Sequence, residues 1–572
     1  MWNDLTGPLL CARCRLSRCT LPRARALTDS TNHRTAFERT AEAVHESVFG
    51  GYKKHLNRPA IVDAVTGASF TYTEVVKQID LLMGALYGEL QFCKWDVVGV
   101  FSPNHLQFPV VIHAVIKAGG TVSPANPTYN ANELAYQLKD SGAKYLFVHP
   151  ALLDTALPAA AKVGIPDARI ILLNEGPVNK SGGRFKTVKQ VSEANFVPAP
   201  TVKFTADEIQ NRTAYLCYSS GTTGLSKGVE TTQRNVIANI LQFDKFQEKA
   251  QDLGAREVWT GVLPFFHMYG LTISLHICFQ RGYTLVVFPK FELPLFLTSL
   301  GKYHVTTAHI VPPIALALAK SPIVDHFKFP KLKTLMSGAA PLAPELVAEI
   351  WRRLHIKTVQ GYGLTETSPV SHIMPLSYAL EFPKSMGHLF PGMEARIVNP
   401  DSGKDCGLKE EGEIWMRGPN VMKGYHNNKT ATANSIDKDG FFHTGDIGFV
   451  DENGLWYIVD RLKELIKYKG FQVPPAELEA YLLEHPAVAD CAVIGRPDEA
   501  AGEVPRAYVV LKPKSNISAS DIVGFIDKKV APHKRLRGGV IFIDEIPKAA
   551  SGKILRRVLR EQDKATSKSS KL

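Results

Sequence analysis

From about residue 60 onward, short apolar runs alternate with stretches of helical periodicity. Val97–Phe101 and Lys144–Val148 have the length and composition of buried strands, and a helix is expected between them around Phe108–Ala118. Strands that alternate with helices are typical of mainly parallel sheets covered by helices. The pattern therefore predicts an α/β fold, whose large N-terminal domain has several subdomains built on mainly parallel sheets.

The pattern changes near residue 460, where an apolar strand ending at Val459 leads directly into a charged stretch. We place a domain boundary there, and expect a first domain over residues 45–459 and a small second domain over residues 460–560. Residues 1–44 are expected to form a disordered extension, and residues 561–572 a C-terminal tail.

The longest uncharged run, Val258–Phe279, is long enough to cross a bilayer. It contains Pro264, His267, Gly270 and His276, which disfavour a membrane span. We interpret the run as a buried strand, a loop and the start of a helix, and expect no transmembrane segment.

The net charge of +12 is concentrated at the two ends of the chain. Residues 1–35 carry six Arg and two Asp, and residues 461–572 carry 21 Lys or Arg and 14 Asp or Glu. The middle lacks the basic stripe with aromatic residues that is typical of nucleic-acid binders, so no nucleic-acid partner is expected. Basic charge in the C-terminal segment suits a small polyanionic ligand such as a nucleotide or coenzyme A. The eight Cys are too dilute for a disulfide framework, which favours a reducing compartment.

The two ends of the chain carry different targeting signals. Residues 1–35 are rich in Arg and poor in acidic residues, as in a mitochondrial transit peptide, although a disordered tail is an equally good interpretation. Residues 570–572 are Ser-Lys-Leu, the address that the peroxisomal import receptor reads. We expect the peroxisome, with the cytoplasm and the mitochondrion as alternatives.

A loop rich in glycine and hydroxyl groups lies between the apolar run Ala214–Cys217 and a stretch that we expect to be a helix. Its glycines let backbone N–H groups approach an anion closely, its hydroxyls add donors, and Lys227 adds a positive charge. The spacing excludes a Walker loop, and the alternative is a flexible surface loop. The residues expected to bind phosphate are Ser219, Ser220, Gly221, Thr222, Thr223, Gly224 and Lys227.

This loop resembles the phosphate loop of the adenylate-forming superfamily, which includes acyl-CoA synthetases, 4-coumarate–CoA ligases, beetle luciferases and peptide-synthetase adenylation domains. One departure is Ser226, where many relatives have Pro. The resemblance covers about residues 45–560, and it implies an ATP-dependent acid–CoA ligase that uses ATP, Mg²⁺ and coenzyme A. The other segments that match superfamily motifs, in the same order, are 263–267, 337–342, 360–366, 442–446, 460–473 and 547–553.

For the adenylation half-reaction, the resemblance implies roles that suit the chemistry. A carboxylate attacks the α-phosphate of ATP, so the site must neutralise negative charge and align the reactants. Glu366 is expected to hold Mg²⁺, Thr365 to donate a hydrogen bond and Asp446 to bind the ribose hydroxyls. By resemblance, Lys553 bridges the carboxylate and the α-phosphate from a mobile α+β C-terminal domain. Expected adenine contacts are Tyr362, which stacks on the base, with the small residues Gly338, Ala339 and Ala340. Gln360 and Gly361 are also expected to bind the nucleotide.

For acyl transfer to coenzyme A, the small domain should present a different face. By resemblance, the residues near the nucleotide or acyl group are Arg461, the hinge residue Lys463, Lys467 and Gln472. Those near coenzyme A are Lys469, Gly470 and Lys290. Without the resemblance, segment 461–472 would be interpreted as a Lys-rich, solvent-exposed hairpin. The expected catalytic residues are Lys553, Lys467, His267, Thr365 and Glu366.

The acid is expected to bind beside His267, which by resemblance gates the acyl pocket and the thiol tunnel. An imidazole cannot anchor an ammonium group, so amino-acid substrates are disfavoured. The pattern is closest to 4-coumarate–CoA ligases and favours a flat aryl acid such as 4-coumarate or cinnamate, with medium-chain fatty acids as the alternative. A luciferase-like monooxygenase and a non-catalytic nucleotide or CoA binder are disfavoured. The pocket is expected to contain His267, Met268, Tyr269, Ser274, Gly361, Gly363 and Val370.

Overall fold

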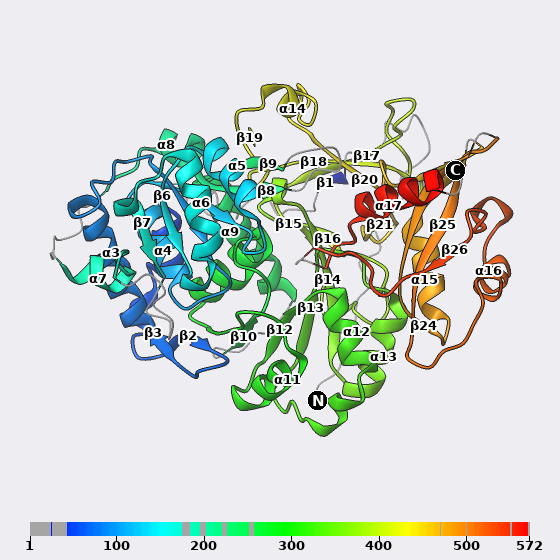
Figure 1. Ribbon diagram of the computed structural model, residues 1–572, viewed down its shortest axis with the longest axis horizontal. Coiled ribbons are helices and arrows are strands. Elements are labelled where there is room, and N and C mark those ends of the chain that lie inside the picture. The colour runs from blue at the N-terminus through cyan, green and yellow to red at the C-terminus, as the bar shows by residue number, and fades with distance from the viewer. Residues whose placement is uncertain are drawn as a thin grey trace, which may run out of the picture.

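The computed structural model describes residues 24–25, 43–173, 183–194, 202–219, 226–250, 257–469, 471–498, 500–549 and 552–569. A large part, with three sheets, extends to Arg461, and a small part carries the fourth sheet (Figure 1). The α/β class predicted from the sequence is confirmed. Among the described residues, no helix is long and apolar enough to cross a membrane.

The first sheet has seven strands in the order β19-β9-β8-β5-β4-β6-β7. All neighbouring strands from β8 through β5, β4 and β6 to β7 pair in parallel. Strand β9 pairs antiparallel with both β8 and β19. Its strands are β4 (Val97–Phe101), β5 (Thr121–Ala125), β6 (Ala143–Val148), β7 (Ile170–Leu172), β8 (Thr213–Ser219), β9 (Lys227–Thr232) and β19 (Gly424–Tyr425).

The second sheet has nine strands in the order β16-β15-β14-β13-β12-β10-β11-β2-β3. It is parallel from β14 to β2 and antiparallel at both edges. Its strands are β2 (Pro59–Asp63), β3 (Ser69–Thr71), β10 (Val258–Gly261), β11 (Thr284–Val287), β12 (Thr307–Ile310), β13 (Thr334–Ser337), β14 (Lys357–Gly363), β15 (Val370–Ile373) and β16 (His388–Leu389).

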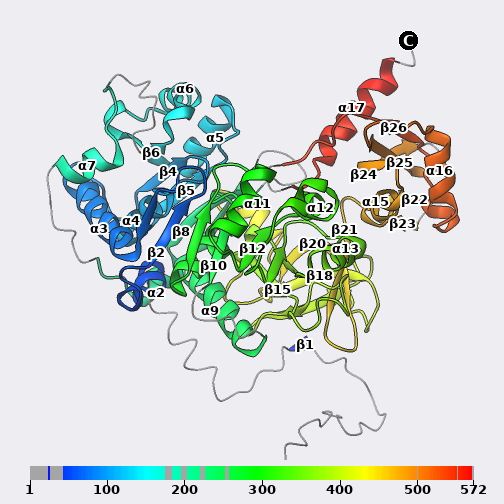
Figure 2. The ribbon, with the colours of Figure 1, turned by 90° about the horizontal axis from the view of Figure 1, so that it is seen from below.

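The two sheets are stacked with helices between and outside them (Figure 2). Strand β6 shows the reason: Tyr145 and Phe147 pack into the core between the sheets, and Leu146 and Val148 pack into the outer core. The inner helices are α2 (Val44–Phe49), α3 (Tyr72–Gly88), α4 (Phe108–Lys117) and α9 (Gln233–Ala250). The outer helices are α5 (Ala131–Ser141) and α6 (Leu153–Val163) on the first sheet, and α11 (Leu293–Lys302), α12 (Pro312–Lys320) and α13 (Pro344–Leu354) on the second.

The third sheet is antiparallel and leads the chain out of the large part. Its last strand ends at Arg461, within the charged stretch where we expected the domain boundary. Its strands are β1 (Ala24–Arg25), β17 (Glu394–Val398), β18 (Gly412–Arg417), β20 (Phe442–Val450) and β21 (Trp456–Arg461). The remaining helices of the large part are α7 (Val188–Ala194), α8 (Ala206–Asn211), α10 (Cys278–Gln280) and α14 (Lys429–Ala433).

The small part has its own apolar core, centred on buried residues such as Ile466, Leu478 and Val509. Helix α17 lies between the small sheet and the large part (Figures 1 and 2). The strands are β22 (Ile466–Tyr468), β23 (Phe471–Val473), β24 (Val488–Asp498), β25 (Gly502–Leu511) and β26 (Val540–Phe542), and the helices are α15 (Pro475–Glu484), α16 (Ala519–Asp527) and α17 (Arg556–Ser569).

One local expectation is wrong. The phosphate loop leads into strand β9 and not directly into a helix, and α9 begins only at Gln233. Val229, Thr231 and Thr232 are β-branched and buried, and they pair with the edge of β8. Pairing with β8 therefore makes residues 227–232 a strand, although the helical pattern of the residues that follow suggested that a helix begins there.

Candidate active site

The phosphate loop closes a hairpin between β8 and β9. Ser219 and Lys227 are directly paired residues of the two strands. The hydroxyl of Tyr136, on α5, donates a hydrogen bond of 3.0 Å to the carbonyl of Ser226 at the end of the loop. The predicted phosphate ligands Ser220, Gly221, Thr222, Thr223 and Gly224 lie outside the described residues.

Glu366 lies beside this hairpin, in a short 3₁₀ turn over Thr365–Thr367 that follows β14. One carboxylate oxygen, Oε1, accepts hydrogen bonds from Ser219 Oγ at 3.2 Å and from the Tyr425 hydroxyl at 2.9 Å. The other oxygen, Oε2, has no hydrogen-bond partner within the part of the chain that the structure describes. A carboxylate oxygen of a largely buried glutamate, next to a phosphate loop, suits a hard cation such as Mg²⁺.

Asp446 lies on β20, where two side chains hold its carboxylate. Its Oδ2 accepts a hydrogen bond of 2.6 Å from the Tyr362 hydroxyl, and its Oδ1 lies 3.1 Å from Arg461 Nε. Burial and the neighbouring Asp446 charge raise the pKa of Tyr362, so the phenol keeps its proton and donates. Because a carboxylate has about four acceptor positions, Asp446 still has capacity for ribose hydroxyls.

The side chain of Gln360 connects two neighbouring loops. Its Oε1 accepts the Leu342 N–H at 2.8 Å, and its Nε2 donates to the Pro383 carbonyl at 2.6 Å. Both ends of the side-chain amide therefore hold neighbouring loops, and a contact between Gln360 and the nucleotide stays a prediction.

The predicted adenine loop contacts the predicted acyl pocket. Gly338 packs against the ring of Tyr269, and a Cβ atom added to Gly338 would lie 2.8 Å from Tyr269 Cε1. The Tyr269 hydroxyl donates to the Met336 carbonyl at 3.1 Å, which fixes the ring. Next to Gly338, Ala339 adopts the left-handed backbone region with φ of 70°, and Ala340 is half-buried.

The other predicted pocket residues lie on or next to the π-helix Tyr269–Ile277 and on strands β14 and β15. Met268 is buried, and the Cys217 thiol lies 3.3 Å from its sulfur. Ser274 is fully buried, and its hydroxyl has no partner among the residues that the structure covers. Gly363 is required where it stands, because a Cβ atom there would lie 2.0 Å from the Pro369 carbonyl oxygen. Gly361 and Val370 lie on the antiparallel pair β14 and β15.

Lys553 approaches the large part from the small one. The preceding residue, Gly552, lies against Pro313 at the start of α12, with 3.2 Å between an added Cβ atom and the ring. Burial and the charge of Lys553 lower the pKa of His267 to about 4, which keeps the imidazole neutral. Lys553 and His267 therefore lie within electrostatic range of each other.

The same lysine is surrounded by the other predicted charged residues. Burial and then the charge of Arg461 lower the pKa of Lys553 to about 8, while Asp446, Glu464 and Glu366 act in the opposite direction. The structure thus brings Lys553, Asp446, Glu366 and Arg461 to one site. This arrangement suits the neutralisation of a triphosphate and a carboxylate.

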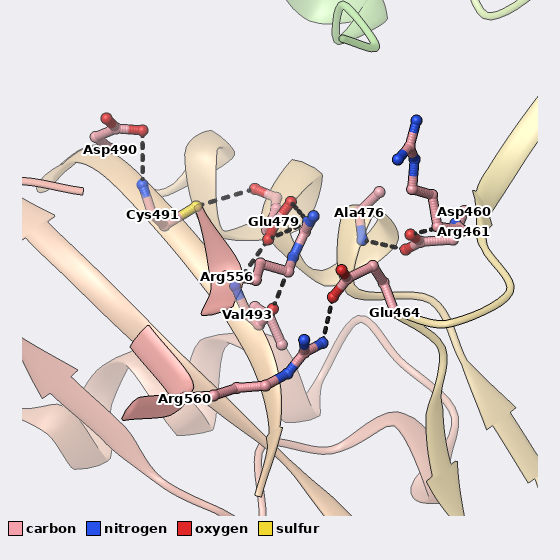
Figure 3. A network of polar contacts seen from close by, with 10 residues as sticks. All are labelled: Asp460, Arg461, Glu464, Ala476, Glu479, Asp490, Cys491, Val493, Arg556 and Arg560. Atoms are coloured by element: carbon pink, nitrogen blue, oxygen red, sulfur yellow. Dashed lines mark hydrogen bonds and ion pairs between the residues drawn. The ribbon is translucent and has the colours of Figure 1, made fainter. Parts of the chain in front are cut away.

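A buried network connects the strand that leaves the large part to the small part (Figure 3). The Asp460 carboxylate accepts the Ala476 N–H, at the start of α15, at 2.9 Å, and the Arg461 N–H at 2.7 Å. Burial raises the pKa of Asp460 to about 6, and the Arg556 charge opposes this shift. Asp460 therefore joins β21 of the large part to the first turn of α15.

Arg556 and Arg560 attach α17 to the same network (Figure 3). Arg556 Nη2 lies 2.7 Å from each Glu479 oxygen, and its Nε donates to the Val493 carbonyl at 3.1 Å. Arg560 forms an ion pair with Glu464. Because α17 begins three residues after Lys553, these contacts position that lysine.

Apart from Arg461, the described transfer-step residues are not brought into this site. Lys463, Lys467 and Lys469 are exposed, and the latter two lie on or next to the β22–β23 hairpin. None of them is among the charges that shift the pKa of Lys553 or His267. Lys290 is 76% exposed and pairs with Glu292 at 2.8 Å. Gly470 and the side chain of Gln472 lie outside the described residues.

Comparison with known proteins identifies the group to which this site belongs. Residues 50–426 match the AMP-binding enzyme family, and residues 477–553 match the AMP-binding enzyme C-terminal domain. The chain belongs to the AMP-binding enzyme family. This finding confirms the superfamily and the AMP-forming ligase class that the motifs indicated. Lys553 is the last residue of the C-terminal match.

Relatives within the AMP-binding family cover nearly the whole chain. The chain is 41% identical to "Probable 4-coumarate--CoA ligase 1" of Dictyostelium discoideum, over 88% of this chain and 92% of that protein. It is 39% identical to "Peroxisomal OPC-8:0-CoA ligase 1" of Arabidopsis thaliana, over 90% and 92%. A similar solved structure, ATP-bound MatB from Rhodopseudomonas palustris, has a TM-score of 0.78 and 27% identity, over 91% of this chain and 99% of that one.

Several contacts in this AMP-binding enzyme could not be found by motif. Segments of the candidate site are held together by the side chains of Tyr425, Tyr136 and Gln360. Tyr425 is 59 residues from Glu366, which it contacts. Arg556 and Glu479 are 77 residues apart. The sequence signal for such pairs is weak, because single polar residues on short strands and helix faces occur throughout any chain.

Proposed function

We propose that this protein is an ATP-dependent acid–CoA ligase that forms an acyl-adenylate and then an acyl-CoA thioester. The observation that carries the proposal is Lys553, a residue of the small part that lies within electrostatic range of His267, Asp446 and Glu366. A buried lysine with a lowered pKa, where the small part meets the large one, is costly unless an anion arrives to pair with it. The two anions of adenylation, a carboxylate and an α-phosphate, suit that position.

In the first half-reaction, a carboxylate oxygen forms a bond to the α-phosphorus, and the bond from that phosphorus to the bridging oxygen of pyrophosphate breaks. Lys227 and the phosphate loop bind the β- and γ-phosphates, Asp446 orients the ribose, and Lys553 stabilises charge on the α-phosphate. In the second half-reaction, the thiol sulfur of coenzyme A attacks the acyl carbon, a proton leaves the thiol, and AMP departs. The exposed Lys467 and Lys469 then belong to the face that the small part presents after rotation.

Glu366 is the proposed Mg²⁺ ligand. Its oxygen Oε2, which has no partner among the described residues, supports the assignment, and a bound cation would neutralise charge on the phosphates. Thr365 is proposed to donate a hydrogen bond beside it. Both roles rest on position in the fold together with the expected chemistry.

We propose an aryl acid of the 4-coumarate or cinnamate type as substrate, with a medium-chain fatty acid as the alternative. Tyr269 offers a fixed aromatic face, and contact with a flat acid adds about 0.5–1.5 kcal/mol beyond burial of apolar area. A longer aliphatic chain could compensate, because each buried CH₂ contributes about 0.8 kcal/mol. The name of the Dictyostelium relative supports the aryl acid.

The test is isotope exchange between pyrophosphate and ATP, and thioester formation, with 4-coumarate, cinnamate, hexanoate and octanoate. We expect a higher kcat/KM for the aryl acids, and a loss in Tyr269→Ala that is about tenfold larger for aryl than for aliphatic acids. A preference for octanoate, or an equal loss for both classes, would assign the enzyme to medium-chain acids. No exchange with any carboxylic acid would contradict the ligase proposal itself.

We propose that the protein acts in the peroxisome, through recognition of residues 570–572 by the import receptor. The address at the terminus supports this location, and so does the name of the Arabidopsis relative. A fluorescent reporter that ends in residues 563–572 should enter peroxisomes, and one that begins with residues 1–35 should remain diffuse. Mitochondrial import of the second reporter would contradict the proposal.

A further inference from the structure

Tyr425 lies between the two groups that we assign to the phosphates of ATP. Lys227 Nζ is 4.0 Å from the centroid of the Tyr425 ring. The Tyr425 hydroxyl donates a hydrogen bond of 2.9 Å to Glu366 Oε1. One side chain therefore contacts the cation of the phosphate loop with its face and the carboxylate of the proposed metal site with its edge.

The fold leaves this ring little freedom. β19 pairs antiparallel with β9, and Tyr425 is the residue opposite Val229, two positions after Lys227 (Figure 1). The Tyr425 N–H donates to Thr432 Oγ1 at 2.9 Å. The ring packs in an apolar cluster with Met422 and Phe442 and is only 9% exposed.

Each of the two contacts has a direct consequence for its partner. An aromatic face attracts a cation, so the ring holds Lys227 near the phosphate site when no phosphate is present. The phenol donates to Oε1 of Glu366, an oxygen that Ser219 already contacts. The carboxylate is thereby fixed with its second oxygen available.

We propose that Tyr425 is a positioning residue that holds Lys227 and Glu366 in the arrangement which Mg²⁺ and ATP require. Its hydroxyl orients the Glu366 carboxylate for the metal ion, and its ring face keeps Lys227 extended toward the β- and γ-phosphates. This inference rests on the proposed function, because it takes Glu366 as the metal ligand and Lys227 as the phosphate ligand.

Two substitutions separate the contributions of the hydroxyl and the ring. Tyr425→Phe removes only the hydrogen bond to Glu366, and we expect the Mg²⁺ concentration for half-maximal adenylation to rise about fivefold to tenfold. The affinity for a non-hydrolysable ATP analogue without Mg²⁺, measured by calorimetry, should change by less than about twofold. Tyr425→Leu also removes the ring face, so this metal-free affinity should fall about fivefold.

Lys227→Ala then identifies the target of the ring. In the Lys227→Ala background, the step from Tyr425→Phe to Tyr425→Leu should no longer weaken metal-free binding of the analogue, because the cation is gone. A matched control is Tyr457→Phe, which removes another hydroxyl that donates to a carboxylate of the large part, Asp451 at 3.1 Å. This control should leave both the Mg²⁺ response and analogue binding unchanged.

The outcomes distinguish this inference from the proposal on which it rests. If Glu366→Gln raises the Mg²⁺ requirement and Tyr425→Phe does not, the role of Tyr425 is wrong and the metal assignment stands. If Glu366→Gln leaves the Mg²⁺ response unchanged, the metal assignment fails and the inference fails with it. Equal losses of melting temperature and of kcat in both Tyr425 variants, with unchanged Mg²⁺ response and analogue binding, would reduce Tyr425 to a packing residue.

Discussion

The charge on Lys553 depends on pH within the range in which enzymes work. Its pKa is lowered to about 8, mainly by burial and next by Arg461. A lysine stabilises developing negative charge only while it is protonated. In the free enzyme, Lys553 therefore loses its proton and its positive charge as pH rises through about 8.

We expect kcat/KM for ATP in adenylation to fall as pH rises through about 8, since this parameter reports the pKa values of the free enzyme. Lys553→Arg keeps its charge at every pH tested, so the decline should be absent in that variant even if its rate is lower. Pyrophosphate exchange at a series of pH values measures both profiles. The same decline in both proteins would assign the titration to another group.

The site residues that could be predicted from the sequence are those that stand in motifs with an unusual concentration of polar and glycine residues. Lys227, Glu366, Asp446 and Lys553 stand in dense polar segments, and the fold brings the last three together. Gln360 belongs to such a segment as well, yet its side chain holds two loops. A motif gives the position of a residue but does not give the direction of its side chain, which depends on neighbours that are remote in the sequence.

Helix α17 shows how an element positions a catalytic group that it does not itself contain. Arg556 pairs with Glu479 on α15, and both side chains are nearly buried, with exposed fractions of 14% and 11%. The next residue, Arg557, pairs with Glu561 on the same helix, but these side chains are 70% and 60% exposed. The two neighbouring arginines provide a matched comparison.

Arg556→Gln should destabilise the small part by about 3–5 kcal/mol, because it leaves the Glu479 carboxylate buried without its partner. Adenylation should slow in parallel, since the segment that carries Lys553 loses its attachment. Arg557→Gln should change stability by less than about 0.5 kcal/mol. Urea unfolding and pyrophosphate exchange test both variants, and similar effects of the two substitutions would contradict the role of the buried pair.

At the level of elements, the parallel strands and covering helices were predictable because both faces of the strands are apolar. Strand β9 was missed because its sequence is largely polar and it directly precedes a long helix. The network around Asp460 was also missed, because its members come from β21, α15 and α17. Local periodicity contains no information on which of these elements meet.

In the whole molecule, Lys553 lies within electrostatic range of Asp446 and Glu366, while Lys467 and Lys469 are exposed. On the proposed function, this is the position of the small part for adenylation. Thioester formation requires coenzyme A to reach the acyl group, so we propose that the small part rotates between the two steps.

We therefore expect Lys553→Ala to slow acyl-adenylate formation about a thousandfold, because a charge used in the transition state is removed. Transfer to coenzyme A from a supplied acyl-adenylate should remain within about threefold of the wild-type rate. Separate rapid-mixing assays measure the two steps. An equal loss in both would mean that one face serves the whole reaction.

We expect the contact between Tyr269 and Gly338 to couple the binding of the two substrates. On the proposed assignment, Tyr269 borders the acid and Gly338 belongs to the loop that borders the base, so occupancy on one side changes the free energy of binding on the other. Reciprocity then requires that any factor by which an acid tightens ATP binding is the factor by which ATP tightens binding of that acid. Redesign of the acid pocket at Tyr269 will consequently shift the affinity for nucleotide, and compensating changes at Ala339 or Ala340 will shift acid selectivity.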